Sequence, residues 1–301
     1  MVEQYRKSPL TFEQQVQRLI SRGLRVKSID EARKILEVIN YYRLSGYWHP
    51  LKKTDGSDQF RDDGSFELAI EFYEFDRKLR LLLMDMIERI EVTVRCQVSN
   101  HFAVNYGPFS HEDPGLFRDV EKHREWVERL HKETRESKEV FVQHFKNKYA
   151  EYPGLPVFVA AEVMSLGSMS WIFKWMKRVD RSTISRVHGL QPETFESWLR
   201  SLAFVRNLCA HHSRTWNRHI SVAPAIPPSI NGWEPSQIPN PQRIYAVLCV
   251  LRYLSRNYDC GSSWASKVAV LMAQFDRDSE WQNAMGIPPD WRDSVFWNGV
   301  T

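Results

Sequence analysis

Cysteine is scarce in this 301-residue sequence, which contains only four. The four are Cys96, Cys209, Cys249 and Cys260, and they show neither CxxC spacing nor a grouping with histidine. Zinc sites in proteins are usually built from Cys and His ligands at short, regular spacing. The sequence therefore favours neither a metal site nor a cofactor, and we expect four reduced, buried thiols in a cytoplasmic protein.

Long apolar runs and the common catalytic motifs are also missing. No apolar segment follows the polar residues 1–9, so no secretory signal is expected. The most apolar window, 155–176, is interrupted by charged residues and serines, which favours a buried helix over a membrane span. GxGxxG, Walker A, HExxH and GxSxG motifs are absent. These absences argue against the commonest nucleotide-binding, metalloprotease and hydrolase classes, and against a membrane partner.

Glycine and proline are absent from about Phe66 to Tyr106, where apolar residues recur at helical spacing. This pattern predicts a helix of some forty residues, or two nearly collinear helices. The same periodicity runs through most of the chain, and 43% of the residues are hydrophobic. We therefore predict an all-α, multi-helix bundle with a long central helix and N-terminal helical elements.

Helix start and stop signals divide the remaining sequence. Capping-box patterns at 11–14 and 28–31 predict two N-terminal helices. Further helices are predicted over 120–149 with a break near Ser137, and over 157–177, 181–187, 193–214, 243–257 and 264–275. The predicted parts are an N-terminal helical and aromatic element (1–60) packed on the core, a helical core (61–260), and a C-terminal helix with a docked tail (261–301).

Acidic residues are absent from Ser197 to Trp233, although the whole chain has 37 of them and 41 Lys and Arg. This window contains three histidines and four arginines, Arg200, Arg206, Arg214 and Arg218. The four arginines equal the formal excess of +4 that the whole chain carries. A local basic patch attracts phosphates better than the same charge spread over a surface, so nucleic acid is a candidate partner.

A helical wheel gathers the polar residues of this window if the helix continues to residue 218. One face then holds Arg206, Asn207, His211, Arg214, Asn217 and Arg218. Arginines can bind a phosphate and stabilise developing charge, and a histidine can take or give a proton near neutral pH. Asn207 stands one turn before His211 and could orient its imidazole. The alternative is a solvated face with a histidine at the helix end.

The residues Arg206 and Asn207, followed by His211, match the R-x4-6-H motif of the HEPN superfamily. Five segments extend the match: LTFEQQVQRLISRGL near the start, INYYRLSGYWHPL at 39–51, YEFDRKLRLLLMDMIERIEVTVR at 73–95, MSLGSMSWIF at 164–173 and FVRNLCAHHSRTWNR at 204–218. In combination they make roughly residues 5–255 resemble the Abi-like family, the AbiD/AbiF-type bacterial abortive-infection proteins.

This resemblance implies a HEPN-like helical bundle and a metal-independent endoribonuclease. In such enzymes the 2′-hydroxyl of RNA attacks its own phosphate and leaves a 2′,3′-cyclic phosphate and a 5′-hydroxyl. Arg206 would stabilise the phosphate, His211 would be the general acid/base and Asn207 would support them. His212 also fits the permitted spacing. Arg214, Asn217 and Arg218 would contact RNA.

The resemblance also implies a partner and a biological setting. HEPN motifs usually meet in pairs at a composite cleft, and the single strong copy in this sequence argues for a homodimer. Family members of this type act as toxins in phage defence, and some are restrained by a small non-coding RNA. RNA would thus be the substrate and, for some members, also a regulator.

Three alternatives stay open from the sequence. Arg95 and His101 form a second match to R-x4-6-H, although Arg95 more simply pairs with a carboxylate one turn before it. The second alternative concerns function, because the basic face from Arg206 to Arg218 would also serve a non-catalytic RNA-binding protein. The third alternative is a regulator that binds other proteins through its aromatic residues.

Overall fold

A computed structural model describes residues 8–149, 154–256, 263–275 and 279–300. Within these residues the regular secondary structure is helical, and the only β-type pairings are isolated bridges such as Phe117–Met176. The prediction of an all-α, multi-helix protein is confirmed.

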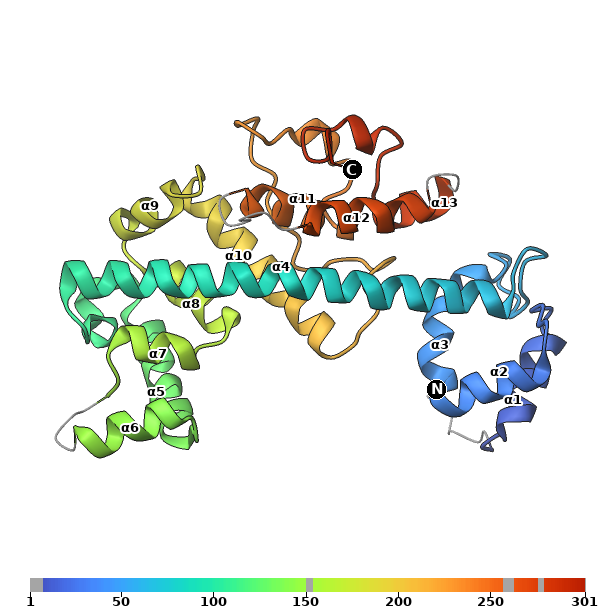
Figure 1. The fold of residues 1–301 in the computed structure, drawn as a ribbon, viewed down its shortest axis with the longest axis horizontal. Coiled ribbons are helices and arrows are strands. Elements are labelled where there is room, and N and C mark those ends of the chain that lie inside the picture. Colours follow the sequence, from blue (N-terminus) through green and yellow to red (C-terminus); the bar gives the residue numbers. More distant parts are fainter. Residues whose placement is uncertain (1–7, 150–153, 257–262, 276–278, 301) are drawn as a thin grey trace. The chain divides into compact units, whose positions relative to one another are not determined.

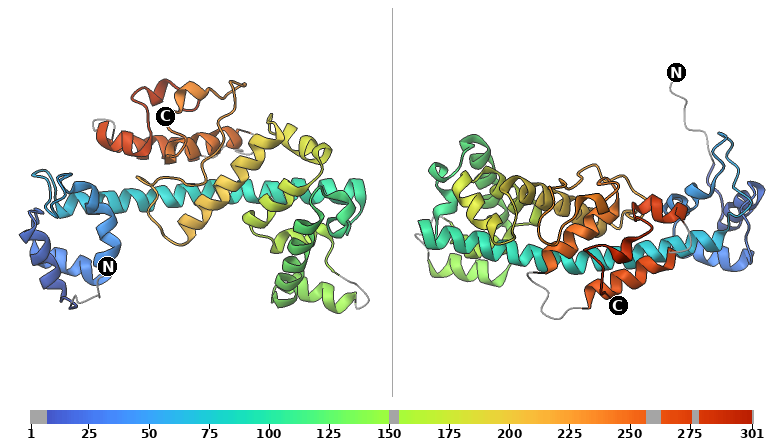
Figure 2. Two further views of the ribbon diagram at one scale, coloured as in Figure 1. Left: turned by 180° about the vertical axis from the view of Figure 1, so that it is seen from behind. Right: turned by 90° about the horizontal axis from the view of Figure 1, so that it is seen from above.

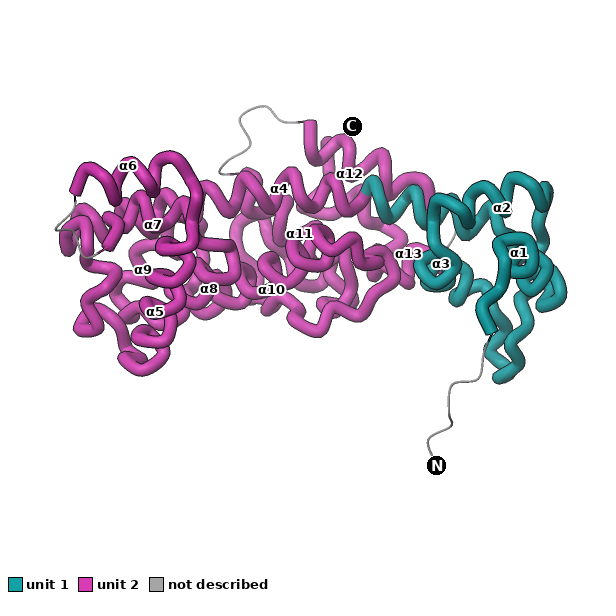
Figure 3. Tube along the Cα trace, turned by 90° about the horizontal axis from the view of Figure 1, so that it is seen from below, with its two compact units in different colours: residues 1–78 teal, residues 79–301 magenta. Residues whose placement is uncertain are grey.

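The chain forms two compact units that divide between Lys78 and Leu79 (Figure 3). Unit 1 comprises residues 1–78, and unit 2 comprises residues 79–301. The division falls inside one helix, α4. The three-part organisation expected from the sequence, with boundaries at 60 and 260, stays a prediction.

Unit 1 contains three helices and the beginning of a fourth. They are α1 (Phe12–Ser21), α2 (Ile29–Val38), α3 (Tyr41–Trp48) with the short 3-10 helix η1 (His49–Leu51), and the start of α4 (Phe66–Tyr106). The predicted capping box is present, because the Thr11 and Gln14 side chains each accept a hydrogen bond from the other residue's backbone N–H. Buried Tyr47 of α3 donates its hydroxyl hydrogen bond to the Asp76 carboxylate of α4, at 2.7 Å.

Helix α4 is the longest element, with 41 residues, and it confirms the predicted long helix. It ends where the sequence indicated, since Gly107 follows it with φ +98°, a left-handed conformation that glycine adopts without steric cost. Its buried residues recur at helical spacing through unit 2, from Leu83 and Ile87 to Val98 and Phe102. Such a stripe offers a continuous apolar face on which the other helices of the unit can pack.

The helices of unit 2 are arranged around this part of α4 (Figures 1 and 2). They are α5 (Val120–Glu136), α6 (Val140–Lys148), α7 (Val157–Val163), α8 (Leu166–Trp175), α9 (Arg178–Arg186), α10 (Pro192–Ala210), α11 (Ile244–Ser255), α12 (Trp264–Met272) and α13 (Ser279–Met285). The 3-10 helices are η2 (Ser110–Glu112), η3 (Pro114–Leu116), η4 (Pro235–Gln237), η5 (Ala273–Phe275) and η6 (Trp291–Asp293). The break predicted near Ser137 is present between α5 and α6.

The single helix predicted over 157–177 is wrong, because α7 and α8 are separate helices. The chain turns at Met164 and Ser165, where the Ser165 hydroxyl accepts a hydrogen bond from the Ser168 backbone N–H and begins α8. The Met164 carbonyl accepts a hydrogen bond from Arg95 Nη2 at 2.6 Å. Two polar groups thus stabilise the break within an apolar sequence.

The C-terminal part of the chain packs into the core of unit 2. Eleven of the twelve residues of α11 are buried, as expected for a central helix that is apolar on nearly every side. Trp264 of α12 donates its indole N–H to the Leu82 carbonyl at 2.7 Å. Trp291 and Trp297, near the C-terminus, are buried as well.

Three of the four cysteines lie in the described part of the chain. Cys209 and Cys249 are buried, whereas Cys96 is exposed on α4, contrary to expectation. Cys260 lies outside the described residues. No helix in the described part of the chain has the length and apolarity needed to span a bilayer.

Buried histidines should make stability depend on pH. Burial, together with the neighbouring His131 and His123, lowers the pKa of His111 to about 4, and burial lowers the pKa of His188 to about 4. Below pH ~6.5 the unfolded chain binds protons at these positions before the folded chain does, so stability falls as the pH decreases. We expect each histidine to reduce the free energy of unfolding by about 1.4 kcal/mol per pH unit between roughly pH 6 and 4.

Urea unfolding across this pH range measures the effect. The His188→Gln variant should show a shallower pH dependence than the parent protein, because one of the two groups is gone. An unchanged slope would contradict this account.

Candidate active site at the end of helix α10

Helix α10 begins with Pro192 in its first turn, as predicted, and ends at Ala210. A Schellman motif stops it: the Ser213 N–H donates to the Leu208 carbonyl at 2.8 Å, and the His212 N–H donates to the Cys209 carbonyl at 2.9 Å. His212 occupies the left-handed position of this motif, with φ +54°. Among the described residues it is the one non-glycine residue with a positive φ.

The helix predicted over 193–214 therefore stops at Ala210, and the condition for the helical wheel, a helix that continues to residue 218, is not met. Arg214, Asn217 and Arg218 lie on an irregular segment, each half-buried, and do not form one helix face with Arg206. Fully buried Trp216 anchors this segment in the core. A residue from a later part of the chain also holds the backbone of this segment, because Arg243 Nη1 donates to the Asn217 carbonyl at 3.3 Å. Burial of the Trp216 indole stabilises this irregular backbone more than further turns of helix would, although the helical wheel alone would favour a longer helix.

The last turns of α10 carry Arg206, Asn207 and the capping residue His211. Arg206 Nη1 donates to Asn207 Oδ1 at 3.2 Å. The Asn207 carbonyl accepts the His211 backbone N–H at 3.0 Å. Asn207 thus orients the arginine through its side chain and reaches the histidine only through its backbone. The expectation that its amide would orient the imidazole is not met.

A carboxylate that the sequence could not reveal accompanies Arg206. Glu91 of α4 is buried and forms a salt bridge with Arg95 at 2.5 Å. Its other oxygen lies 3.9 Å from Arg206 Nε. The basic window 197–233 has no acidic residue of its own, but α10 crosses α4 (Figures 1 and 2), and this crossing supplies the counter-charge.

The two residues of the second R-x4-6-H match have different surroundings. Arg95 pairs with Glu91 one turn before it, as its simpler interpretation expected, and also donates to the Met164 carbonyl. His101 Nε2 lies 2.7 Å from the Asp180 carboxylate of α9, which also accepts the Tyr106 hydroxyl at 2.7 Å. The structure brings Arg95 next to Arg206 through Glu91, while His101 is held against α9.

The exposure of the three central residues suits contact with an external anion. The Arg206 side chain is 33% exposed, and Asn207 and His211 are both exposed. A guanidinium that is oriented from two sides loses less conformational entropy when it binds a phosphate. Within the described residues no group of three or more His, Cys, Asp or Glu side chains is placed to hold a metal ion.

This geometry defines an all-α protein with an exposed Arg-Asn-His arrangement at a helix end. A comparison with protein families matches the model described as Abi-like protein to residues 34–217, well over half of the chain. The chain therefore belongs to the Abi-like protein family. The match covers α4 and α10 completely and includes Arg206 and His211. Membership suggests a role in abortive infection, a defence against phage, and is consistent with nuclease activity.

Comparisons with curated proteins and with solved structures give no match.

Glu91 should contribute to the stability of unit 2. Glu91→Gln removes a buried charge that pairs with Arg95, so we expect the free energy of unfolding to fall by about 1.5–3 kcal/mol. Glu162→Gln is the matched control, because its carboxylate also approaches Arg95, at 3.9 Å, but is 60% exposed. The control should change stability by less than about 1 kcal/mol. Equal urea midpoints for the two variants would show that Glu91 has no special role.

His212 should be replaceable by glycine with a gain in stability. His212→Gly relieves the left-handed backbone conformation of an L-residue and should raise the free energy of unfolding by about 1 kcal/mol. The control is His211→Gly, where φ is −87° and glycine relieves nothing. Thermal unfolding of both variants measures the difference, and destabilisation by His212→Gly would refute the argument.

Proposed function

We propose that this protein is a metal-independent endoribonuclease of the HEPN type that acts as a toxin in phage defence. The observation that carries the proposal is the placement of Arg206, Asn207 and His211 together at the exposed end of α10. Asn207 and Glu91 hold the guanidinium of Arg206 from two sides. Family membership supports the biological setting, because the Abi-like family is associated with abortive infection.

The proposed reaction is transesterification within the RNA backbone. The 2′-oxygen forms a bond to the adjacent phosphorus while the bond from phosphorus to the 5′-oxygen breaks. A general base takes the proton of the 2′-hydroxyl, and a general acid gives a proton to the departing 5′-oxygen. His211 is the proton-transfer residue, and Arg206 stabilises the negative charge that develops on the phosphate oxygens.

This reaction favours two copies of the chain at one cleft. Base and acid act on opposite sides of the phosphorus, whereas one protomer has one Arg206–His211 pair. A homodimer would supply a second histidine and a second arginine. Arg214 and Arg218 would add positive charge beside the cleft and attract the RNA, whether it is a substrate or a restraining non-coding RNA.

Of the two neighbouring histidines, we assign the proton transfer to His211. It directly follows the last residue of α10, one turn after Asn207, and its backbone φ is negative, at −87°. The backbone of His212 is instead turned into the left-handed region by the motif that ends the helix. A purified His212→Gly variant should consequently keep its nuclease activity.

Substitution of the assigned residues should abolish cleavage. Acid–base catalysis and charge stabilisation each contribute about 10²–10⁴ to a rate. We expect His211→Ala and Arg206→Ala to lower the rate constant of RNA cleavage by such factors when purified protein is assayed in excess EDTA. His219→Ala, a change at another exposed histidine of the same segment, should leave the rate within a few-fold of the wild type. Wild-type rates in His211→Ala would contradict the assignment.

The second candidate function is RNA binding without cleavage, which the absence of acidic residues from 197–233 also favours. In that case the wild-type protein would cut nothing, and Arg206→Ala would weaken binding and flatten its salt dependence. His211→Ala would then have little effect on binding.

A further inference from the structure

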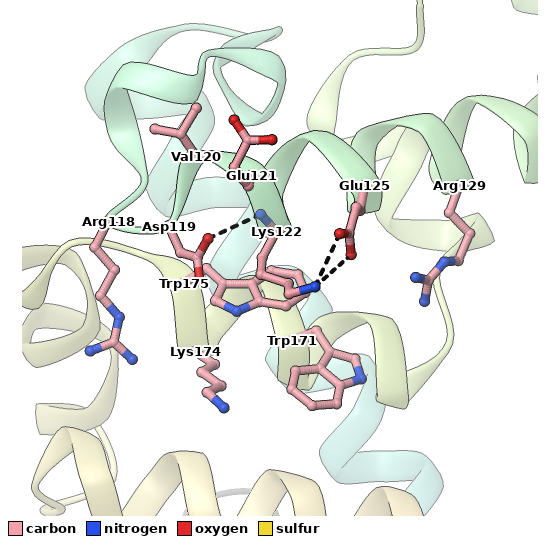
Figure 4. A pocket seen from close by; sticks show the side chains of 10 residues that line it. All are labelled: Arg118, Asp119, Val120, Glu121, Lys122, Glu125, Arg129, Trp171, Lys174 and Trp175. Carbon is pink, nitrogen blue, oxygen red and sulfur yellow. Dashed lines mark hydrogen bonds and ion pairs between the residues drawn. The ribbon is translucent and has the colours of Figure 1, made fainter.

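A cleft in unit 2 lies between the first turns of α5 and the outer side of α8, away from the Arg206–His211 pair. It has a volume of about 970 Å³. Figure 4 shows the side chains that line it: Arg118, Asp119, Val120, Glu121, Lys122, Glu125, Arg129, Trp171, Lys174 and Trp175. We call it the Trp171 cleft. Its volume is in the range of pockets that bind small organic groups.

Two stacked indoles form one wall of this cleft. The rings of Trp171 and Trp175 are 5.4 Å apart between centroids, with an interplanar angle of 19°. Trp175 is 9% exposed and Trp171 is 36% exposed, and both side chains line the cleft (Figure 4). A tryptophan held by a second tryptophan is a rigid aromatic surface, and it loses little side-chain entropy when another flat ring stacks on it.

Cations surround this aromatic surface. Lys174 Nζ lies 5.1 Å from the centroid of the Trp171 ring, and Arg200 Cζ of α10 lies 5.5 Å from it. Arg118 and Arg129 add two further positive charges to the lining. An indole with cations beside it attracts a ligand that combines flat rings with negative charge.

The acidic side chains of the cleft already have local partners. Glu125 pairs with Lys122 at 2.9 Å, and Glu121 pairs with Arg124 at 3.1 Å. Asp119 accepts the Lys122 backbone N–H and caps α5. Arg118 Nη2 lies 3.9 Å from the Glu196 carboxylate, which Arg181 also binds at 2.6 Å. The lining also contains the cations Arg129 and Lys174, to which Arg200 adds.

Helix α10 connects the Trp171 cleft with the proposed catalytic residues. Successive residues of a helix are rotated by 100°, so Arg200, Asn207 and His211 lie within about 40° of one another. All three are exposed. The rise between Arg200 and His211 is about 16 Å. Between them this side of the helix contains half-buried Phe204 and exposed Asn207, and it leads from the cleft to the end of the helix.

The geometry points to a base-binding subsite: we propose that the Trp171 cleft stacks an unpaired base of a single-stranded RNA whose backbone follows α10 toward His211. Stacking on aromatic rings next to basic side chains is the general mode of single-strand binding. The inference rests on the proposed function only in taking RNA as the ligand, and the subsite does not require that the RNA be cut.

The test is a binding titration of the full-length chain with a fluorescently labelled 12-nucleotide oligouridine. All proteins carry His211→Ala, so that the probe stays intact. Trp171→Ala should weaken binding by about 5- to 150-fold, the range expected for the loss of one stacked base. Trp171→Phe should keep most of the affinity. The matched control is Phe158→Ala, which removes a 50% exposed aromatic ring from α7 and should leave binding unchanged.

Two further arms make the test independent of folding defects and of cleavage. Arg200→Ala alters only an exposed side chain and should reduce the slope of log K against log salt concentration by about 0.7. A duplex of the same length should be bound equally by the parent and by Trp171→Ala, because its bases are not available for stacking.

The outcomes separate the two proposals. Undiminished binding by correctly folded Trp171→Ala would overturn the subsite and leave the nuclease proposal standing. Trp171-dependent binding in this titration, together with no RNA cleavage by the protein that retains His211, would support the subsite and overturn the nuclease. An equal loss of affinity for single strand and duplex would show that Trp171 acts through something other than stacking, which also overturns the subsite.

Discussion

The arrangement of the proposed site depends on the ion pairs of one buried group, the carboxylate of Glu91. It is buried in α4, pairs with Arg95 at 2.5 Å and lies 3.9 Å from Arg206 of α10. Arg95 in turn donates to the Met164 carbonyl, where α7 ends and the chain turns into α8. One buried anion thus joins three parts of unit 2. A buried charge without partners would cost several kcal/mol, so Glu91 constrains where both guanidinium groups can lie.

This constraint gives the exposed end of α10 its chemical character. A single arginine at a helix end would sample many rotamers, whereas Arg206 is held between Glu91 and the Asn207 amide while one third of its side chain stays accessible. His211 follows at the point where the helix stops. The same helix presents Arg200 to the indole of Trp171, so one element carries both the proposed catalytic residues and part of the proposed base-binding subsite.

Much of the fold follows from local patterns in the sequence. Apolar periodicity without glycine or proline predicts α4 over its full length, and the capping residue Thr11 and the terminating Gly107 lie where expected. Local sequence patterns do not predict those features of the structure that depend on tertiary contacts. The end of α10 depends on the burial of Trp216, and the partner of Arg206 comes from a helix more than one hundred residues earlier. The stacked pair Trp171 and Trp175 has helical i, i+4 spacing, but the spacing alone does not distinguish an exposed platform from core packing.

The most direct test of the account uses an RNA in which the nucleotide before the cut carries a 2′-deoxy sugar. If the phosphate is attacked by its own 2′-hydroxyl, the purified protein in EDTA should cut the unmodified RNA and leave a 2′,3′-cyclic phosphate, and the modified position should resist cleavage. Cleavage at the 2′-deoxy position, or cleavage of the unmodified RNA that stops in EDTA, would contradict a mechanism in which Arg206 and His211 act without a metal.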